Sequence, residues 1–181
     1  MRQNKYSNLK SKSVIPLVPR DLTPVLFFRQ PNGRSQKIDL SFLAEGKYPR
    51  PQIADACVGV FWLEMQRYSS PSREKFRDSL RVFNKFLNWR AEGGVGRYVS
   101  TTLEIKSELF VEFSAYLELL HKSSSAHGTY HAAARFFKIM QSVRPEYLCS
   151  DLAVGLEYRP LFLLGSCDYS PHTYSFSGLQ K

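Results

Sequence analysis

The alternation of apolar and polar positions changes character near residue 51. Before that point, the two β-prone runs 25–29 and 34–40 flank the turn Asn32-Gly33. Asn and Gly both tolerate positive φ, so this pair between two such runs predicts a β-hairpin. From Pro51 to about residue 142, apolar residues recur at helical spacing instead.

This second part predicts four helices, at about 51–68, 72–91, 103–121 and 124–142. Short segments separate them that are rich in Ser, Thr, Pro and Gly, the residues favoured at helix ends. The residues expected to face the core are Ile53, Ala56, Val60, Trp62 and Leu63 in the first helix, Phe76, Leu80, Phe83, Phe86 and Leu87 in the second, Leu109, Phe113, Tyr116, Leu117 and Leu120 in the third, and Tyr130, Ala133, Ala134 and Phe137 in the fourth. The predicted fold is mainly α, a four-helix bundle with a small N-terminal β-hairpin extension.

The chain is expected to divide into three parts. Residues 1–50 would hold a basic leader interrupted by prolines, the hairpin and a linker, and residues 51–145 would form the helical domain. After residue 145 the periodicity degrades, and residues 146–181 are expected to be a linker or tail.

Charge is unevenly distributed over the predicted helices. The chain carries a formal net charge of +9 and has a pI near 9.6. In the second helix the basic residues repeat every four positions beside the apolar face, with Asn84 and Asn88 in the same stripe. In the fourth, a stripe without acidic residues lies opposite the core face, whereas in the third helix Glu outnumbers Lys. The two basic stripes comprise Arg73, Arg77, Arg81 and Lys85, and His127, His131, Arg135, Lys138 and Ser142.

Two basic helices separated by an acidic one predict a polyanionic partner, because the stripes could contact phosphates on either side of a groove. Guanidinium groups offer a planar fork to phosphate or to guanine edges. Thr129 and the serines 123–125 add hydroxyls at a helix start. The competing interpretation is that each stripe is simply a solvated face.

Signatures of catalysis, cofactors and metals are absent from the sequence. It contains no Walker-type loop, no GxSxG and no HExxH. Its three cysteines, Cys57, Cys149 and Cys167, lie far apart, and His127 with His131 lacks an evident third ligand. We therefore expect no cofactor, no metal and no small-molecule substrate. No signal peptide or membrane-spanning run is evident, so a cytoplasmic location is expected.

Three segments together resemble the core-binding domain of tyrosine recombinases, the phage integrase family. Ser72–Trp89 resembles its second helix. Residues 103–120 resemble the segment that follows in the family, a Thr-Leu start and a helix ending in Tyr-Leu, and Ser123–Lys138 resembles the next helix. The resemblance covers about residues 51–145. It implies a SAM-like four-helix bundle across one face of double-stranded DNA, with the second and fourth helices approaching the major groove. Site-specific recombination and integration of a mobile element, with other recombinase protomers as further partners, would be the wider role.

The catalytic part of that family has no counterpart in this sequence. The family's catalytic domain supplies an Arg, a His-x-x-Arg pair and a nucleophilic Tyr, but His131 and Arg135 are four apart and lie within the bundle. The C-terminal tyrosines 158, 169 and 174 have no such groups around them. Because phosphotyrosyl chemistry needs several cations on the scissile phosphate, the chain alone is not expected to be an enzyme.

The leading hypothesis is double-stranded DNA binding by an integrase-type arm. The expected DNA-binding residues are Arg73, Arg77, Arg81, Lys85, His127, Thr129, His131, Arg135 and Lys138. The alternative is a helical protein-interaction module whose basic surface has no role in DNA binding. A stand-alone hydrolase has almost no support, since no acid, base and nucleophile can be named.

Overall fold

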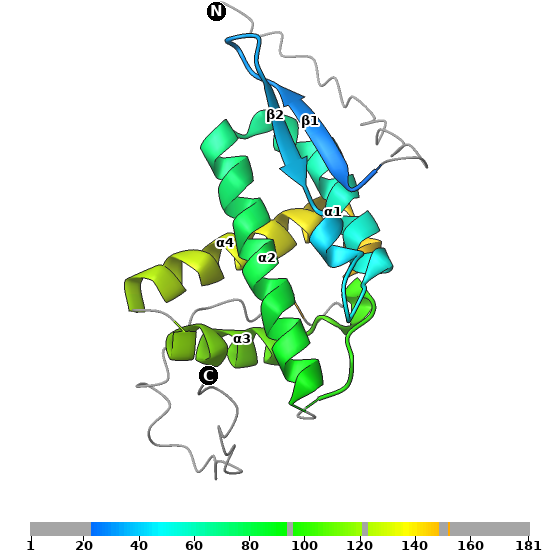
Figure 1. Ribbon diagram of the computed structural model, residues 1–181, viewed down its shortest axis with the longest axis vertical. Coiled ribbons are helices and arrows are strands. Elements are labelled where there is room, and N and C mark those ends of the chain that lie inside the picture. Colours follow the sequence, from blue (N-terminus) through cyan, green and yellow to red (C-terminus); the bar gives the residue numbers. More distant parts are fainter. Residues whose placement is uncertain (1–22, 94–95, 121–122, 149–151, 153–181) are drawn as a thin grey trace, which may run out of the picture.

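The computed structural model describes residues 23–93, 96–120, 123–148 and 152 (Figure 1). Over these residues the protein is mainly helical with one two-stranded antiparallel sheet, which confirms the coarse fold prediction. The basic leader 1–20 and nearly all of the tail 146–181 lie outside the described residues. The elements are β1 Val25–Arg29, β2 Ser35–Asp39, α1 Pro51–Glu64, α2 Ser70–Glu92, α3 Ser107–Leu120 and α4 Ser123–Val143, joined in part by 3-10 turns at Ser41–Leu43, Met65–Arg67, Thr102–Glu104 and Pro145–Tyr147.

The hairpin forms where the turn signal placed it. β1 and β2 pair from Val25 opposite Asp39 to Arg29 opposite Ser35. Beyond the last pair, the Gln30 N–H donates to the Arg34 carbonyl at 2.8 Å, and Gly33 adopts φ +80°. A loop of this kind needs a left-handed residue at its last position, which glycine supplies without steric cost. Asn32 keeps negative φ, and its Oδ1 accepts a hydrogen bond from the Arg34 N–H instead.

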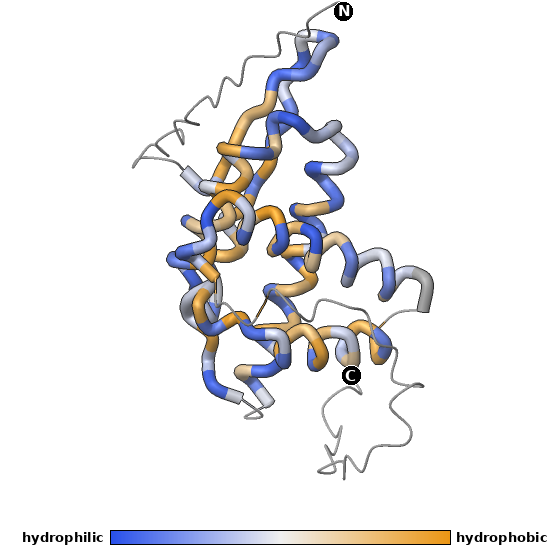
Figure 2. The backbone as a smooth tube through the Cα atoms, turned by 180° about the vertical axis from the view of Figure 1, so that it is seen from behind, coloured by the Kyte–Doolittle hydropathy of each residue, from blue (hydrophilic) through white to orange (hydrophobic). Residues whose placement is uncertain are grey.

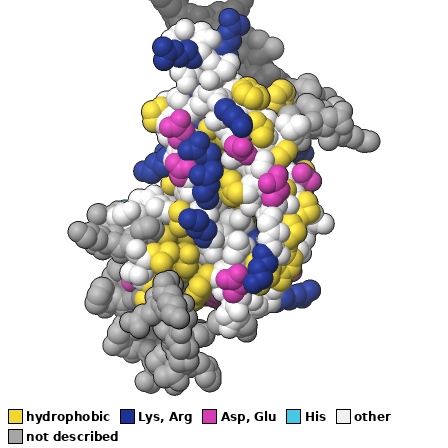
Figure 3. All heavy atoms as spheres, in the orientation of Figure 1, with side chains coloured by type: hydrophobic (Ala, Val, Ile, Leu, Met, Phe, Trp, Pro, Cys, Tyr) yellow, Lys and Arg dark blue, Asp and Glu magenta, His cyan; other side chains and the backbone are white. Residues whose placement is uncertain are grey.

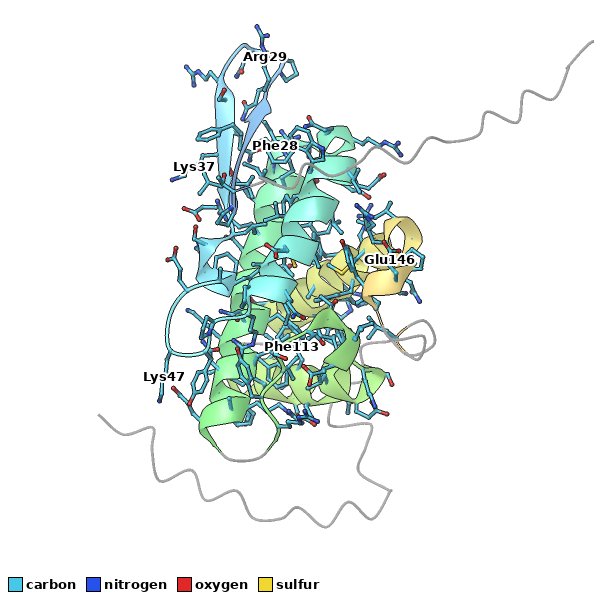
Figure 4. The ribbon with its side chains drawn as sticks, turned by 90° about the vertical axis from the view of Figure 1, so that its right-hand side faces the viewer. Phe28, Arg29, Lys37, Lys47, Phe113 and Glu146 are labelled. Atoms are coloured by element: carbon cyan, nitrogen blue, oxygen red, sulfur yellow. The ribbon has the colours of Figure 1, made fainter. Side chains whose placement is uncertain are left out.

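The hairpin shares the hydrophobic core of the helices. Leu26, Phe28, Ile38 and Leu40 are buried on its inner side, in the same cluster as the helical core residues. Figure 4 shows Phe28 pointing from the hairpin toward the helices, and its ring lies 6.5 Å from that of Phe61. The packed unit therefore includes the hairpin, so any binding experiment has to retain it.

The four helices pack around a dense group of aromatic rings. In Figure 1 α2 runs along the front, α4 crosses behind it, and α3 lies below; α4 contacts each of the other three helices. The ring of Phe83 on α2 lies 5.0–5.4 Å from those of Phe110, Phe113 and Phe137. Figure 2 shows how hydrophobic and hydrophilic stretches alternate along the elements that enclose this core.

Most of the predicted core is confirmed, but three predicted positions are wrong. Trp62 is 40% exposed, Leu120 is 48% exposed and Leu63 is only half-buried. Two predicted helix boundaries also differ. α1 ends at Glu64 and passes into a 3-10 turn. α3 begins at Ser107, because a 3-10 turn with its own capping box precedes it. Within the described residues, no helix is long and apolar enough to span a membrane.

Candidate nucleic-acid interface

Arg73, predicted to lie in the outer stripe of α2, is buried and serves the fold instead. Its side chain lies between α2, the hairpin and the end of α1. Nε donates to Gln36 at 2.7 Å, and Nη1 donates to the carbonyls of Tyr68 at 2.6 Å and Met65 at 3.1 Å. The guanidinium also lies 4.6 Å from the ring centre of Phe28. With only 5% of the residue exposed, Arg73 cannot contact a nucleic acid.

The rest of the α2 stripe becomes more exposed toward the C-terminus. The Arg77 side chain is 23% exposed and pairs with Asp78 at 2.8 Å. Arg81 is exposed and lies over the ring of Phe42, and Lys85 is exposed. Only Arg81 and Lys85 of the four predicted residues therefore present a largely accessible cation.

Asn84 and Asn88, which the sequence placed in the same stripe, bind a buried arginine that the sequence analysis assigned to a linker. Arg50 is fully buried; its Nε donates to the Val99 carbonyl at 3.0 Å, and its Nη1 lies 2.9 Å from Asn84 Oδ1 and 2.6 Å from Asn88 Oδ1. Desolvation lowers the pKa of Arg50. The two asparagines of the α2 stripe are thus directed toward a buried cation from another segment, for which sequence periodicity gives no signal.

The basic stripe of α4 lies on the surface as predicted. His127, His131, Arg135 and Lys138 are all exposed, while Tyr130, Ala133, Ala134 and Phe137 are buried on the opposite side. The Arg135 guanidinium lies 5.6 Å from the ring centre of Tyr68, which holds the α4 stripe beside the segment that leads into α2. Ser142 is exposed, and its hydroxyl donates back to the Ile139 carbonyl.

The structure adds Lys75 of α2 to this stripe. Lys75 is exposed, and it acts electrostatically on His131 of α4 together with His127 and Lys138. Desolvation and these three neighbours lower the pKa of His131 below its usual value of 6.5. Lys75 is not among the predicted DNA-binding residues, since it lies outside the four-residue repeat. We call Lys75, His127, His131, Arg135 and Lys138 the α2–α4 basic surface.

The two histidines of this surface touch each other. Their Nε2 atoms are 2.9 Å apart and their ring centres 4.1 Å apart. Among the described residues, no group of three or more His, Cys, Asp or Glu side chains could hold a metal ion. The geometry is that of one imidazole donating a hydrogen bond to the other.

A groove of about 510 Å³ lies next to the basic surface, between the N-terminal halves of α2 and α4. Lys75 is on its rim, and Ser79, Val82, Ser125, Gly128, Thr129 and Ala132 contribute to its lining. Thr129, predicted near phosphates, is therefore in the groove and not on the outward stripe. Glu74 and Asp78 also line it, so the groove itself is not uniformly basic.

Acidic side chains intersperse the basic ones on the outward face of α2. Figure 3 shows this face, with Lys and Arg groups alternating with Asp and Glu groups. Near the end of α2, Arg90 donates to Glu112 of α3 at 2.7 Å and is engaged there. The α4 helix itself, by contrast, contains no Asp or Glu. No protein-family model, curated protein or solved structure matches the chain.

Proposed function

We propose that the protein binds double-stranded DNA through the α2–α4 basic surface, as the SAM-like core-binding arm of a tyrosine recombinase. Arg81 and Lys85 on the outward face of α2 would extend the contact, and Arg73 has no part in it. In this role the chain positions DNA for recombination or integration and performs no chemistry by itself. The resemblance stated for residues 51–145 supplies the recombinase context.

The observation that carries the proposal is the convergence of cations from two helices. Lys75 from α2 and His127 and Lys138 from α4 all act electrostatically on His131. Like charges brought together on a surface destabilise one another unless an anion neutralises them. A phosphate backbone supplies regularly spaced negative charges and releases counterions when cations replace them.

The test is fluorescence anisotropy of a labelled duplex with the full chain, at several salt concentrations. With about four to five phosphate contacts, affinity is expected to fall by roughly two to three orders of magnitude between about 50 and 200 mM salt. Arg135→Glu combined with Lys138→Glu should weaken binding and reduce the magnitude of the logarithmic salt slope by about 2. Unchanged affinity and slope in this variant would contradict the proposal.

A matched control reverses two exposed lysines away from this surface. Lys37 lies on β2, and Lys106 directly precedes α3. Lys37→Glu with Lys106→Glu changes the net charge equally, so binding should stay within about threefold because distant exposed charges are screened by salt. A separate variant, Arg81→Glu with Lys85→Glu, measures how far the interface extends along α2.

A second candidate function, a protein-interaction module, rests on α3. Val111, Leu119 and Leu120 on this helix are 49%, 59% and 48% exposed, and apolar surface of this kind favours protein contacts. A stable oligomer in light scattering without DNA, lost in Leu119→Gln, would favour this function. DNA binding that is steep in salt and unaffected by Leu119→Gln would favour the first.

A further inference from the structure

The contact between His127 and His131 limits how the two rings can hold protons. At 2.9 Å, one Nε2–H donates to the lone pair of the other Nε2, so the uncharged pair is satisfied. One added proton can enter at Nδ1 of the donor ring and leaves an imidazolium–imidazole pair with its bond intact. A second would place hydrogen on both Nε2 atoms and break the contact. While the contact is kept, the pair can therefore carry one positive charge but not two.

The charges around His131 disfavour its protonation while the surface is free. Lys138 lies on α4, Lys75 approaches from α2, and both lower the pKa of His131. Arg135 is one turn further along α4, with its guanidinium over the ring of Tyr68. An anion that neutralises these cations would remove the penalty.

Carboxylates on the neighbouring elements bind other partners or are not among the groups that shift the pKa of His131. Glu74 of α2 accepts a hydrogen bond from Gln36, and Asp78 accepts one from Arg77. Glu64, at the end of α1, pairs with Arg67. Glu118, in the last turn of α3, is not among the groups that shift the pKa of His131. Among the described residues, the charged side chains that shift the pKa of His131 are Lys75 and Lys138, beside its hydrogen-bond partner His127.

We propose that the His127–His131 pair is a proton-coupled phosphate contact, in which a phosphate oxyanion seated against Lys75 and Lys138 draws one proton from solvent onto the pair. No covalent bond changes: the proton enters at the Nδ1 of one ring and leaves again when the anion dissociates. The inference rests on the proposed function, since a phosphodiester of duplex DNA is the anion that this function supplies. It adds that DNA binding strengthens as the pH falls.

The sign of the pH dependence follows from linkage. In the free protein the pKa of His131 lies below 6.5, and a bound anion raises it. Binding therefore gains free energy below the pKa of the complex, and this gain disappears as the pH rises through that value. Between the free and bound pKa values, one proton accompanies the contact of the anion with the pair, so affinity should rise by up to about tenfold for each unit by which the pH falls.

The experiment measures protons and affinity on the full chain. Duplex binding is titrated by anisotropy from pH 5.5 to 8 at fixed ionic strength, and calorimetry in buffers of different ionisation enthalpy counts the protons taken up. NMR titration of the imidazole nitrogens follows His131 with and without duplex. The expected results are net proton uptake on binding and a higher pKa for His131 in the complex than in the free protein.

Two variants separate this role from a merely structural one. His131→Gln should flatten the pH dependence of the affinity and abolish most of the proton uptake. Lys75→Gln should raise the pKa of His131 in the free protein toward 6.5, because one cation has been removed, and should reduce the uptake on binding. Lys37→Gln, on β2 and outside this surface, is the matched control, and its pH profile should follow that of the unmodified protein.

The outcomes separate the two proposals. Duplex binding with the same pH slope in the unmodified protein and in His131→Gln overturns the inference and leaves the proposed function standing. If no duplex binds at any pH but inorganic phosphate raises the pKa of His131, the phosphate contact stands with a free anion as its ligand and the proposed function fails. If neither probe shifts the pKa of His131, the inference is wrong.

Discussion

Replacing the buried Arg50 by Met should destabilise the protein, although it removes a buried charge. Among the described residues, the guanidinium has no carboxylate partner and its Nη2 has no hydrogen-bond acceptor. Its bonds go to neutral acceptors: Nε to the Val99 carbonyl, and Nη1, with only two hydrogens, to the oxygens of Tyr48, Asn84 and Asn88. It joins the segment before α1 to α2 and to the loop before α3.

The loss of stability in Arg50→Met depends on which of the four acceptor oxygens water cannot reach. Val99 and Asn84 are 6% and 7% exposed, so two buried oxygens lose their donor, each at about 1–3 kcal/mol. Tyr48 and Asn88 are half-buried, and water can reach them. The substitution also removes the cost of burying the charged guanidinium, which offsets part of the loss. The net expectation is a loss of about 2–3 kcal/mol, which is a fall of roughly 5–10 °C in Tm for a domain of this size.

Urea and thermal unfolding followed by circular dichroism at 222 nm measure this loss. Arg34→Met, at an exposed arginine of the hairpin loop, is the matched control and should change stability by less than about 0.5 kcal/mol. Asn84→Leu combined with Arg50→Met should cost less than the sum of the two single changes, by about 1 kcal/mol or more, because they share one network. Equal or higher stability of Arg50→Met would refute the reasoning, since the burial penalty would then exceed the value of the bonds.

Two further changes test the local structure. Arg73→Met should lower the free energy of unfolding by about 2–3 kcal/mol, because the carbonyls of Met65 and Tyr68 lose their donor. Urea unfolding measures this loss, and stability equal to that of the unmodified protein would contradict the buried position of Arg73. Gly33→Ala should cost about 1–2 kcal/mol in thermal unfolding, because φ +80° strains any side chain, whereas Gly128→Ala in α4, where an added Cβ meets nothing within 4 Å, should stabilise by up to about 1 kcal/mol. The same sign for both glycine changes would show that backbone conformation does not govern them.

Much of the fold could be predicted from the sequence, because periodicity and turn chemistry are local signals. The hairpin follows from Asn32-Gly33 between two β-prone runs, and the four helices follow from apolar spacing and their flanking Ser, Pro and Gly. The pattern cannot show that a charged residue is buried, since charge is read as exposure. Arg50 and Arg73 are satisfied by carbonyls and amides from distant segments, and only the folded chain brings those together.

The two basic stripes differ in solvent exposure because their residues are spaced differently along the helices. Four residues turn a helix by about 400°, so a strict four-residue repeat rotates by about 40° at each step. From Arg73 to Lys85 this amounts to about 120°, which takes the α2 stripe from the buried side, past the part-buried Arg77, to the solvent. In α4 the step from Arg135 to Lys138 is three residues and turns the stripe back by about 60°, so it stays on one face. The sequence therefore contained a reason to place the proposed binding surface on α4, and the charge reversal at Arg135 and Lys138 tests that placement directly.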